Sequence, residues 1–235
     1  MSSRRDVGVI VVAGGRGVRA GAGDPKQYRL LGKVPVLLRA LRPFLAHPAV
    51  DRIVAVLPHA DVSAPPEWLA PLVGDRLTLV AGGAERMASV EQGLSQLTAT
   101  MAVVVVHDGA RPFVDAAVID AVILEARAGR GAVAAVPVSD TIKRSGVGPA
   151  GQPAIVETVS REGLWRAQTP QAFPTEVLRR GLAAARAAGV TVTDDAQAVE
   201  SQGLAVVLVP DRPTNFKLTT PDDFALAEAL LRGER

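Results

Sequence analysis

The feature that most constrains this chain is an apolar run that ends abruptly in a glycine-rich loop. Val7–Val12 has the character of a buried strand, and the loop after it holds five glycines between residues 14 and 23. Glycine lets backbone N–H groups close around an anion, because no Cβ blocks the approach. The same segment carries Arg16, Arg19 and Lys26. It therefore predicts a turn that binds a polyphosphate at the end of a strand.

Further apolar runs follow this strand, with helical patterns between them. We expect strands at Val7–Val12, Arg52–Leu57, Leu77–Ala81, Ala102–His107, Ala132–Val138 and Leu204–Val209. We expect helices at Pro35–Ala46, Arg86–Leu97, Asp115–Ala128, Thr175–Ala188, Asp194–Gln202 and Pro221–Leu231. This alternation is typical of the α/β class, with a Rossmann-like, mostly parallel central sheet covered by helices on both faces. Ligands of such sheets bind beyond the carboxyl ends of the strands, so functional residues should follow Val12, Ala81, His107 and Val138.

The polar segment Ser139–Trp165 interrupts the alternation. Residues 141–144 and 155–159 have the pattern of two hairpin strands, separated by a stretch rich in Gly and Pro. A long hairpin that leaves a compact domain exposes its edges and often packs against another subunit. We therefore predict a single domain over residues 1–235 with a dimerisation arm at about 139–165, the alternative being a flexible insertion.

Composition excludes several classes of protein. The chain has no Cys, which excludes disulfides and thiolate chemistry, and no apolar run of membrane-spanning length. The first residues lack the apolar region of a signal peptide, so a cytoplasmic protein is expected. The formal net charge is only +2 and the arginines are spread along the chain, so a nucleic-acid-binding surface is not indicated.

Three chemistries use a glycine-rich loop after a first strand. A nucleoside-triphosphatase loop requires G-x-x-x-x-G-K-[ST], which the chain lacks. Residues 15–20 match the letters of a dinucleotide-binding G-x-G-x-x-G/A, but residues 21–25 (Gly-Ala-Gly-Asp-Pro) cannot continue a helix. The acidic residue expected about 20 positions further on is also missing. The remaining option is a nucleotidyltransferase loop, which is long and ends in Pro25-Lys26-Gln27.

That loop is one of several ordered motifs that resemble a known family. They are Ala13-Gly14-Gly15-Arg16-Gly17 with Pro25-Lys26-Gln27-Tyr28, Gly82-Gly83-Ala84-Glu85-Arg86 with Ser89-Val90, His107-Asp108-Gly109-Ala110-Arg111-Pro112, Pro137–Lys143, Thr158-Val159-Ser160-Arg161, Gln168-Thr169-Pro170-Gln171, Val192-Thr193-Asp194-Asp195 and Asn215-Phe216-Lys217-Leu218-Thr219. Together they resemble the 2-C-methyl-D-erythritol 4-phosphate cytidylyltransferases of the non-mevalonate isoprenoid pathway. The resemblance spans nearly the whole chain, with Ala84 where the family often has Asp.

The resemblance implies a reaction and its participants. The methylerythritol phosphate would attack the α-phosphate of CTP, giving 4-diphosphocytidyl-2-C-methyl-D-erythritol and pyrophosphate, with Mg²⁺ or another divalent cation. A phosphate monoester is largely dianionic at neutral pH, its second pKa being about 6, so the attack needs no general base. The barrier is then charge repulsion and positioning. The family arm also implies a homodimer whose active sites are shared between subunits.

The residues that match the family motifs receive roles by the same resemblance. The catalytic residues would be Arg19, Lys26 and Lys217. The nucleotide would be bound by Ala13, Gly14, Gly15, Gly17, Gly83, Arg86, Ser89 and Asp108, with Asp108 also the metal ligand. The second substrate would be bound by Arg111, Thr141, Arg161 and Thr193. We expect His107 and Thr169 to support the site rather than react.

Three other functions remain open at this stage. A related transferase, such as a ribitol-5-phosphate cytidylyltransferase, would use the same loop with a different acceptor. A non-catalytic nucleotide sensor would be expected to lack the charged loop residues that this chain keeps. An NAD(P)-dependent reductase is disfavoured by the helix-breaking residues that follow the glycines.

Overall fold

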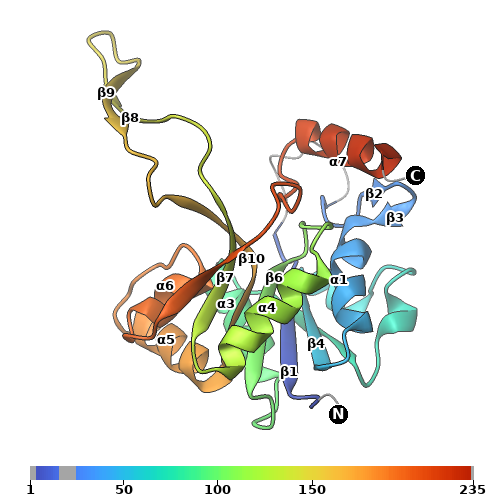
Figure 1. Ribbon diagram of the computed structural model, residues 1–235. Helices are drawn as coiled ribbons and strands as arrows, with labels where there is room; N and C mark the ends of the chain where they lie inside the picture. The colour runs from blue at the N-terminus through green and yellow to red at the C-terminus, as the bar shows by residue number, and fades with distance from the viewer. Residues whose placement is uncertain (1–3, 16–24, 234–235) are drawn as a thin grey trace.

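A seven-stranded mixed sheet forms the centre of the computed structural model, which describes residues 4–15 and 25–233 (Figure 1). The strand order is β11 (Val206–Pro210), β7 (Gly131–Pro137), β10 (Trp165–Pro174), β6 (Val103–Asp108), β1 (Val7–Val12), β4 (Val50–Leu57) and β5 (Leu77–Ala81). β10 is antiparallel to both of its neighbours, and the other pairs are parallel. The predicted fold class is confirmed, with one strand reversed.

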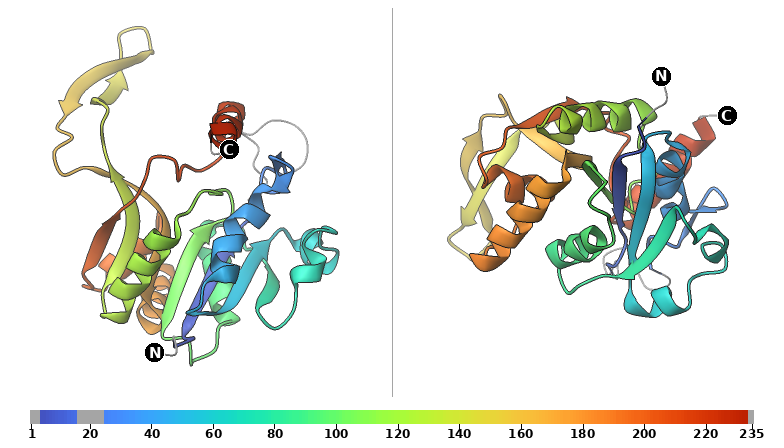
Figure 2. Two further views of the ribbon diagram at one scale, coloured as in Figure 1. Left: turned by 45° about the vertical axis from the view of Figure 1, so that its right-hand side comes forward. Right: turned by 90° about the horizontal axis from the view of Figure 1, so that it is seen from below.

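Helices cover both faces of the sheet, as the view from below shows (Figure 2). One core joins the sheet to α1 (Val36–Ala46) and α4 (Ala116–Arg127). The other joins it to α3 (Arg86–Ser95), α5 (Thr175–Ala187) and α6 (Asp195–Glu200). Within β1, Val9 and Val11 face the first core and Ile10 faces the second, because side chains alternate along a strand. Apolar runs were therefore the correct indicator of doubly covered strands.

Most predicted elements occur within a few residues of their expected ends, but several elements lie outside the prediction. The antiparallel β10 was not predicted, because its middle consists of Gln168, Thr169 and Gln171 rather than apolar residues. Its pairing with β7 skips from Ala167 to Gln171, so residues 168–170 bulge out of the ladder. Four further elements are too short to show a hydrophobic periodicity in the sequence. They are β2 (Leu30–Leu31), β3 (Val34–Pro35), α2 (His59–Ser63) and the 3₁₀ helix η2 (Ala70–Leu72).

The predicted hairpin is present as a separate two-stranded sheet. β8 (Ile142–Val147) pairs antiparallel with β9 (Pro153–Val159) and projects away from the body of the molecule (Figure 1). Several of its apolar side chains are exposed, among them Val147 at 87% and Ile155 at 67%. The chain then returns to the central sheet through β10.

The last helix, α7 (Pro221–Gly233), packs beside the β2–β3 hairpin through a third apolar cluster that includes Leu31, Val36 and Phe224. The guanidinium of Arg29 stacks 3.9 Å from the centre of the Phe224 ring. This packing places residues 217–219, just before α7, at the carboxyl edge of the central strands. A membrane-crossing helix does not occur in the part of the chain that the structure describes, since each helix there is too short or too polar.

Candidate active site

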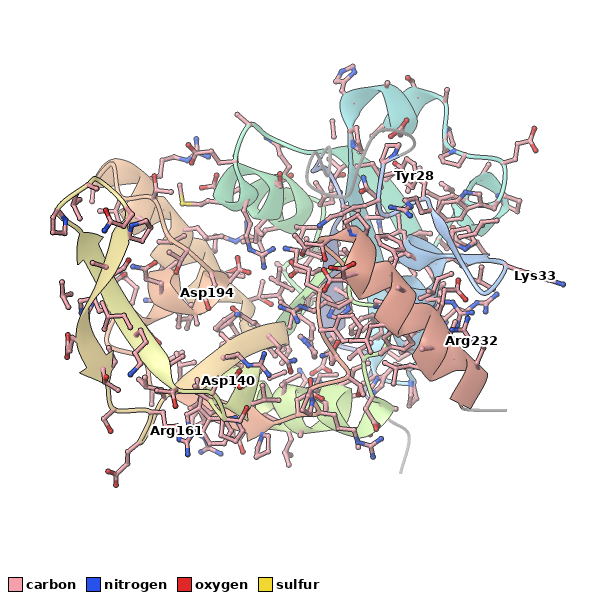
Figure 3. All side chains as sticks on the ribbon, turned by 90° about the horizontal axis from the view of Figure 1, so that it is seen from above. Tyr28, Lys33, Asp140, Arg161, Asp194 and Arg232 are labelled. Atoms are coloured by element: carbon pink, nitrogen blue, oxygen red, sulfur yellow. The ribbon has the colours of Figure 1, made fainter. Side chains whose placement is uncertain are left out.

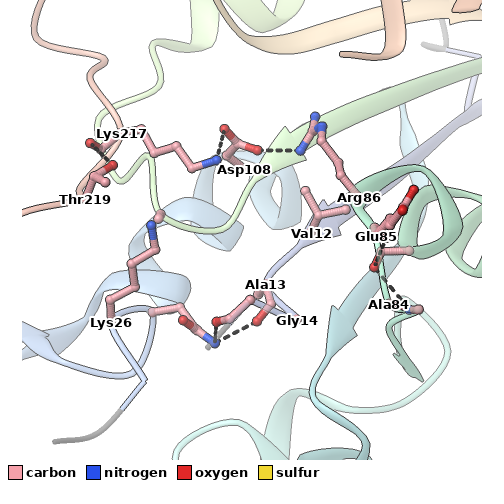
Figure 4. A pocket seen from close by; sticks show the side chains of 15 residues that line it. Val12, Ala13, Gly14, Lys26, Ala84, Glu85, Arg86, Asp108, Lys217 and Thr219 are labelled. Atoms are coloured by element: carbon pink, nitrogen blue, oxygen red, sulfur yellow. Dashed lines mark hydrogen bonds and ion pairs between the residues drawn. The ribbon is translucent and has the colours of Figure 1, made fainter. Parts of the chain in front are cut away.

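A hollow of about 450 Å³ opens at the carboxyl ends of β1, β5 and β6 (Figure 4). Backbone hydrogen bonds join the chain segments just beyond these strands, from Ala13 N–H to Val56 O, from Gly82 N–H to Leu57 O and from Gly109 N–H to Val12 O. The hollow is lined by Val12, Ala13, Gly14, Gly15, Lys26, Gln27, Gly83, Ala84, Glu85, Arg86, Ser89, Asp108, Ala110, Lys217 and Thr219. It lies where three of the four expected strand ends meet.

The turn after β1 is fixed by a side chain that the sequence analysis left without a role. Gln27 is buried, and its Nε2 donates to the carbonyl oxygens of Ala13 at 2.7 Å and Gly15 at 3.2 Å. The backbone carbonyl groups of Ala13 and Gly15 thereby gain hydrogen-bond donors within the protein. Gln27 follows Lys26 directly, so the same short segment shapes the turn and supplies a cation to the hollow.

The loop after β5 is held closed by Ser89. Its hydroxyl accepts from the N–H of Gly83 at 3.1 Å and donates to the carbonyl oxygen of Glu85 at 3.0 Å. A Cβ at Gly83 would lie 2.4 Å from the Cβ of Ala88, so only glycine fits the close approach of this loop to α3. Because the Ser89 hydroxyl donates its proton to the carbonyl oxygen of Glu85, it can only accept a hydrogen bond from any further partner.

Asp108, at the end of β6, is the centre of the charges in the hollow. One of its carboxylate oxygens accepts from Arg86 Nη1 at 2.7 Å, and the other from Arg111 Nε at 3.3 Å and lies 3.1 Å from Lys217 Nζ. Burial alone would raise the pKa of Asp108, but the charges of Arg86, Lys217 and Arg111 outweigh it and hold the pKa far below its usual range. The carboxylate is therefore ionised throughout the physiological range.

Arg86 also reaches a second carboxylate that the sequence analysis did not include in the site. Its Nη2 donates to Asp195 Oδ2 at 2.8 Å, and the Asp195 side chain is only 2% exposed. Asp195 lies in the first turn of α6, while Arg86 begins α3. The sequence motifs contained both residues, but no spacing rule relates positions so far apart in the chain.

Lys26 enters the hollow from the opposite side to Arg86 and points toward the region where Lys217 meets Asp108 (Figure 4). Its charge also acts on Asp223 in α7. Burial works to raise the pKa of Asp223, but N–H groups of Thr219 and Thr220 donate to its carboxylate and, with Lys26, lower that pKa. Two of the four lysines of the chain, Lys26 and Lys217, thus line one hollow.

Behind Asp108, a buried hydrogen-bond chain fixes the loop. The N–H of Asp108 donates to Thr169 Oγ1 at 3.0 Å, and the same hydroxyl lies 3.0 Å from His107 Nδ1. His107 Nε2 lies 3.1 Å from the carbonyl oxygen of Arg111, which can only accept. Burial lowers the pKa of His107 to about 4, so the ring is neutral, with its proton on Nε2. His107 and Thr169 lie where a supporting role, as expected from the sequence, requires them.

The structure brings together nine of the predicted site residues and separates others. Ala13, Gly14, Gly15, Lys26, Gly83, Arg86, Ser89, Asp108 and Lys217 all line the hollow. Arg111 reaches it through Asp108 and donates to the carbonyl oxygen of Asn215 at 2.7 Å. Arg19 and Gly17 lie outside the described residues.

Three residues predicted to bind the second substrate do not line this hollow. Thr141 and Arg161 are exposed at the base of the arm, where Arg161 donates to the carbonyl oxygen of Ser139 (Figure 3). Thr193 is exposed before α6, and its hydroxyl donates to Gln197 Oε1 at 3.2 Å. Arg161 is thus absent from the lining of the hollow that holds Lys26 and Lys217.

Asp108 is also the predicted metal ligand. Within the described ranges, no group of three or more His, Asp or Glu side chains could hold a metal ion. Asp108 offers one carboxylate whose oxygens already accept from cations, and Mg²⁺ beside a nucleotide takes few protein ligands and several phosphate oxygens. Asp108 would therefore add at most one carboxylate to a divalent cation that is held chiefly by the phosphates it accompanies.

Taken with the sheet, the hollow has the chemistry of an α/β nucleotidyltransferase: cations converge beyond strand ends, and a glycine turn leaves room for a phosphate chain. The family described as "IspD: 2-C-methyl-D-erythritol 4-phosphate cytidylyltransferase" matches residues 7–233. The chain belongs to this family.

Individual relatives agree with the family match. The chain is 43% identical over 223 residues to the 2-C-methyl-D-erythritol 4-phosphate cytidylyltransferase of Salinibacter ruber, covering 94% of this chain and 91% of that protein. It is 46% identical over 233 residues to the bifunctional enzyme IspD/IspF of Rhodospirillum rubrum, covering 97% of this chain but only 58% of that relative. The crystal structure of the cytidylyltransferase from Thermus thermophilus superposes with a TM-score of 0.76 at 34% identity, covering 97% of this chain and 99% of that one.

Proposed function

We propose that this chain transfers the cytidylyl group of CTP to 2-C-methyl-D-erythritol 4-phosphate, forming 4-diphosphocytidyl-2-C-methyl-D-erythritol and pyrophosphate in the non-mevalonate isoprenoid pathway. The observation that carries the proposal is the convergence of Lys26 and Lys217 beside the glycine turn in one hollow. We assign the reaction to residues 1–235 acting as one domain, in the cytoplasm, where CTP is available. Some relatives, such as the bifunctional enzyme of Rhodospirillum rubrum, are longer than this chain. The proposal concerns only the part of those relatives that this chain matches.

The nucleotide would lie between the turn after β1 and the loop after β5. The triphosphate would follow the turn at Ala13–Gly15, together with Gly17 and Arg19, because glycine allows backbone N–H groups close to phosphate oxygens. The base would lie against Gly83 and Ser89. A hydroxyl that can only accept suits the N4 amino group of cytosine, whereas the O4 of uracil offers no proton.

The chemical step is an in-line attack by a phosphate oxygen of the acceptor on the α-phosphorus, with pyrophosphate leaving. Lys26, Lys217 and Arg19 would stabilise the charge that builds up around this phosphorus. Asp108 keeps Arg86 and Lys217 in place before the substrates arrive, so little reorganisation is needed at the moment of reaction. A divalent cation, when bound, would supply charge neutralisation between the phosphates.

The acceptor phosphate would require its own cations, and we assign Arg111, Arg161, Thr141 and Thr193 to it. The exposed position of Arg161 and Thr141 at the arm favours contribution to the hollow of a second copy. The exposed apolar side chains of β8 and β9 support the same proposal, since a partner would cover them. The functional unit would then be a homodimer with shared sites.

The direct test is pyrophosphate release measured across a grid of nucleoside triphosphates and sugar-alcohol phosphates, with Mg²⁺ present. We expect turnover with CTP and methylerythritol phosphate, and much less with UTP or with ribitol 5-phosphate. Turnover with ribitol 5-phosphate alone would contradict the proposed acceptor. Binding of CTP without turnover of any acceptor would favour a nucleotide sensor.

A further inference from the structure

Arg86 is held between two carboxylates that come from different parts of the fold. Its two terminal nitrogens lie 2.7 Å from Asp108 Oδ1 and 2.8 Å from Asp195 Oδ2. Asp108 lines the nucleotide hollow, whereas Asp195 is buried at 2% exposure and does not line it. Arg86 is therefore the side chain that links Asp195 to the hollow by hydrogen bonds.

The Asp195 carboxylate is not needed to begin α6. That task belongs to Asp194, which accepts from the N–H of Gln197 at 3.0 Å and from Gln171 Nε2 at 3.0 Å. Stability alone is also a weak reason for a buried carboxylate, because the desolvation of such a pair offsets much of its attraction. The Asp195 carboxylate is therefore costly to bury and is not required to cap α6, which indicates that it has another role.

The planar guanidinium makes that role specific. A guanidinium presents its N–H groups in a rigid fork, so fixing one nitrogen on Asp195 fixes the direction of the other. With Asp195 in place, Arg86 is kept along the wall of the hollow with one nitrogen on Asp108 (Figure 4). Without it, Arg86 would be free to rotate toward the phosphates and draw Asp108 away from Lys217.

We propose that Asp195 is a positioning residue for the nucleotide site, which it controls by orienting Arg86 toward Asp108. The inference rests on the proposed function for its kinetic consequences, but its effect on nucleotide binding is independent of the acceptor. The contact also links the start of α6, two residues after Thr193, to the nucleotide hollow. The ion pair between Arg86 and Asp195 thus couples the start of α3 with the start of α6.

The test is a double-mutant cycle with Asp195→Asn, Arg86→Ala and the combined variant. We expect Asp195→Asn to lower kcat/KM for CTP roughly 10- to 100-fold, as coupled side chains usually do. In the Arg86→Ala background, the same substitution should change kcat/KM less than about twofold, because the hydrogen-bonded link from Asp195 to the hollow is gone. Effects that multiply in the combined variant would overturn the proposal, as would a loss of stability with unchanged kinetics.

Asp194→Asn is the matched control, because it removes a neighbouring carboxylate that acts on the helix end. Its effect should multiply with that of Arg86→Ala. If Arg86→Ala fails to fold, Arg86→Lys replaces it in the cycle, since lysine keeps the charge but lacks the fork.

Calorimetric titration with CTP and Mg²⁺ alone, without acceptor, repeats the cycle at the level of binding. If the wild-type protein binds CTP but turns over no acceptor, the proposed function fails while this titration still decides the role of Asp195. Equal CTP affinity in the wild type and Asp195→Asn, together with equal kcat/KM, would refute that role.

Discussion

Lys217 Nζ lies 3.1 Å from Asp108 Oδ2, although Lys217 lies in the segment before α7 and Asp108 is the last residue of β6. The contact brings the C-terminal part of the chain onto the central sheet at the point where the nucleotide hollow opens. The Lys217 side chain is 42% exposed, whereas that of Asp108 is 7% exposed. The lysine is thus the cation of the cluster that is best placed to exchange a protein partner for a substrate phosphate.

Lys217→Met should remove activity with little loss of stability. We expect kcat to fall by about 10²–10³, the usual loss when one preorganised donor to a developing charge is removed. Asp108 keeps Arg86 and Arg111 as partners, and a partly exposed ion pair contributes about 0–1 kcal/mol, so the midpoint of urea unfolding should hardly change. Steady-state kinetics together with urea unfolding measure both quantities. Activity near that of the wild type would exclude a catalytic role for Lys217.

Lys26→Met should have a similar effect on turnover, since Lys26 enters the same hollow from the other side. We expect a loss of about 10²–10³ in kcat with normal melting. Lys33→Met is the matched control, because Lys33 is exposed and points away from the body (Figure 3). That variant should keep wild-type kinetics. Equal activity of the two variants would contradict the assignment of Lys26.

Gly83→Ala should open the loop after β5. The new Cβ would meet the Cβ of Ala88 at 2.4 Å, so the loop must shift and the hydrogen bond from Gly83 N–H to Ser89 must lengthen. We expect a KM for CTP raised about tenfold or more, with a lower melting temperature. Gly74→Ala, where a Cβ meets nothing within 4 Å, should change neither. An unchanged KM for CTP in Gly83→Ala would mean that this loop does not hold the nucleotide.

Acid should weaken the fold through His107. Its pKa is about 4 in the folded protein and 6.5 as the ordinary value, so between these pH values the unfolded chain binds the extra proton. Stability from this residue is therefore present above pH 6.5 and decreases as the pH falls toward 4, by about 3 kcal/mol in all. Urea unfolding at a series of pH values should show this loss in the wild type and not in His107→Gln. Parallel curves for the two proteins would exclude His107 as the source.

The arm should control the oligomeric state. Val147 is 87% exposed and Ile155 is 67% exposed on a hairpin that extends from the body. Replacing both by Asp places charges where a partner would pack, and we expect the protein to become monomeric by light scattering while its CTP affinity is kept. Activity should fall with the dimer, because Arg161 and Thr141 would no longer reach a second site. A variant that stays dimeric would show that the arm is not the interface.

The parallel part of the sheet could be predicted from the sequence because its strands are buried on both faces and read as continuous apolar runs. β10 could not, since its buried polar side chains bond to distant residues. Gln168 Nε2 donates to the carbonyl oxygen of Asn215, Thr169 Oγ1 accepts from the N–H of Asp108, and Gln171 Nε2 donates to Asp194 Oδ2. Such partners belong to the tertiary structure rather than to the local pattern.

The candidate site divides in the same way. Lys26 could be predicted as a site residue because it ends the glycine-rich loop after the first strand. Asp108 could be predicted because it comes at the end of an apolar strand. The partnership of Arg86 with Asp195 could not, because it joins the first turns of two helices that meet only in the folded protein. Gln27 belonged to a motif, but its role could not be predicted, since a side-chain amide that donates to backbone carbonyls produces no periodic pattern in the sequence.

β10 begins directly beyond the arm and, within its ten residues, supplies the hydroxyl that receives the N–H of Asp108. Insertions and deletions are therefore unequal in their effects along this stretch. Extra residues in the turn at 148–152 lengthen the hairpin and leave the central sheet unchanged. One extra residue within β10 would change its register with β6 or β7 and displace Thr169 from the N–H of Asp108. Length variation among homologous arms should accordingly concentrate at the tip.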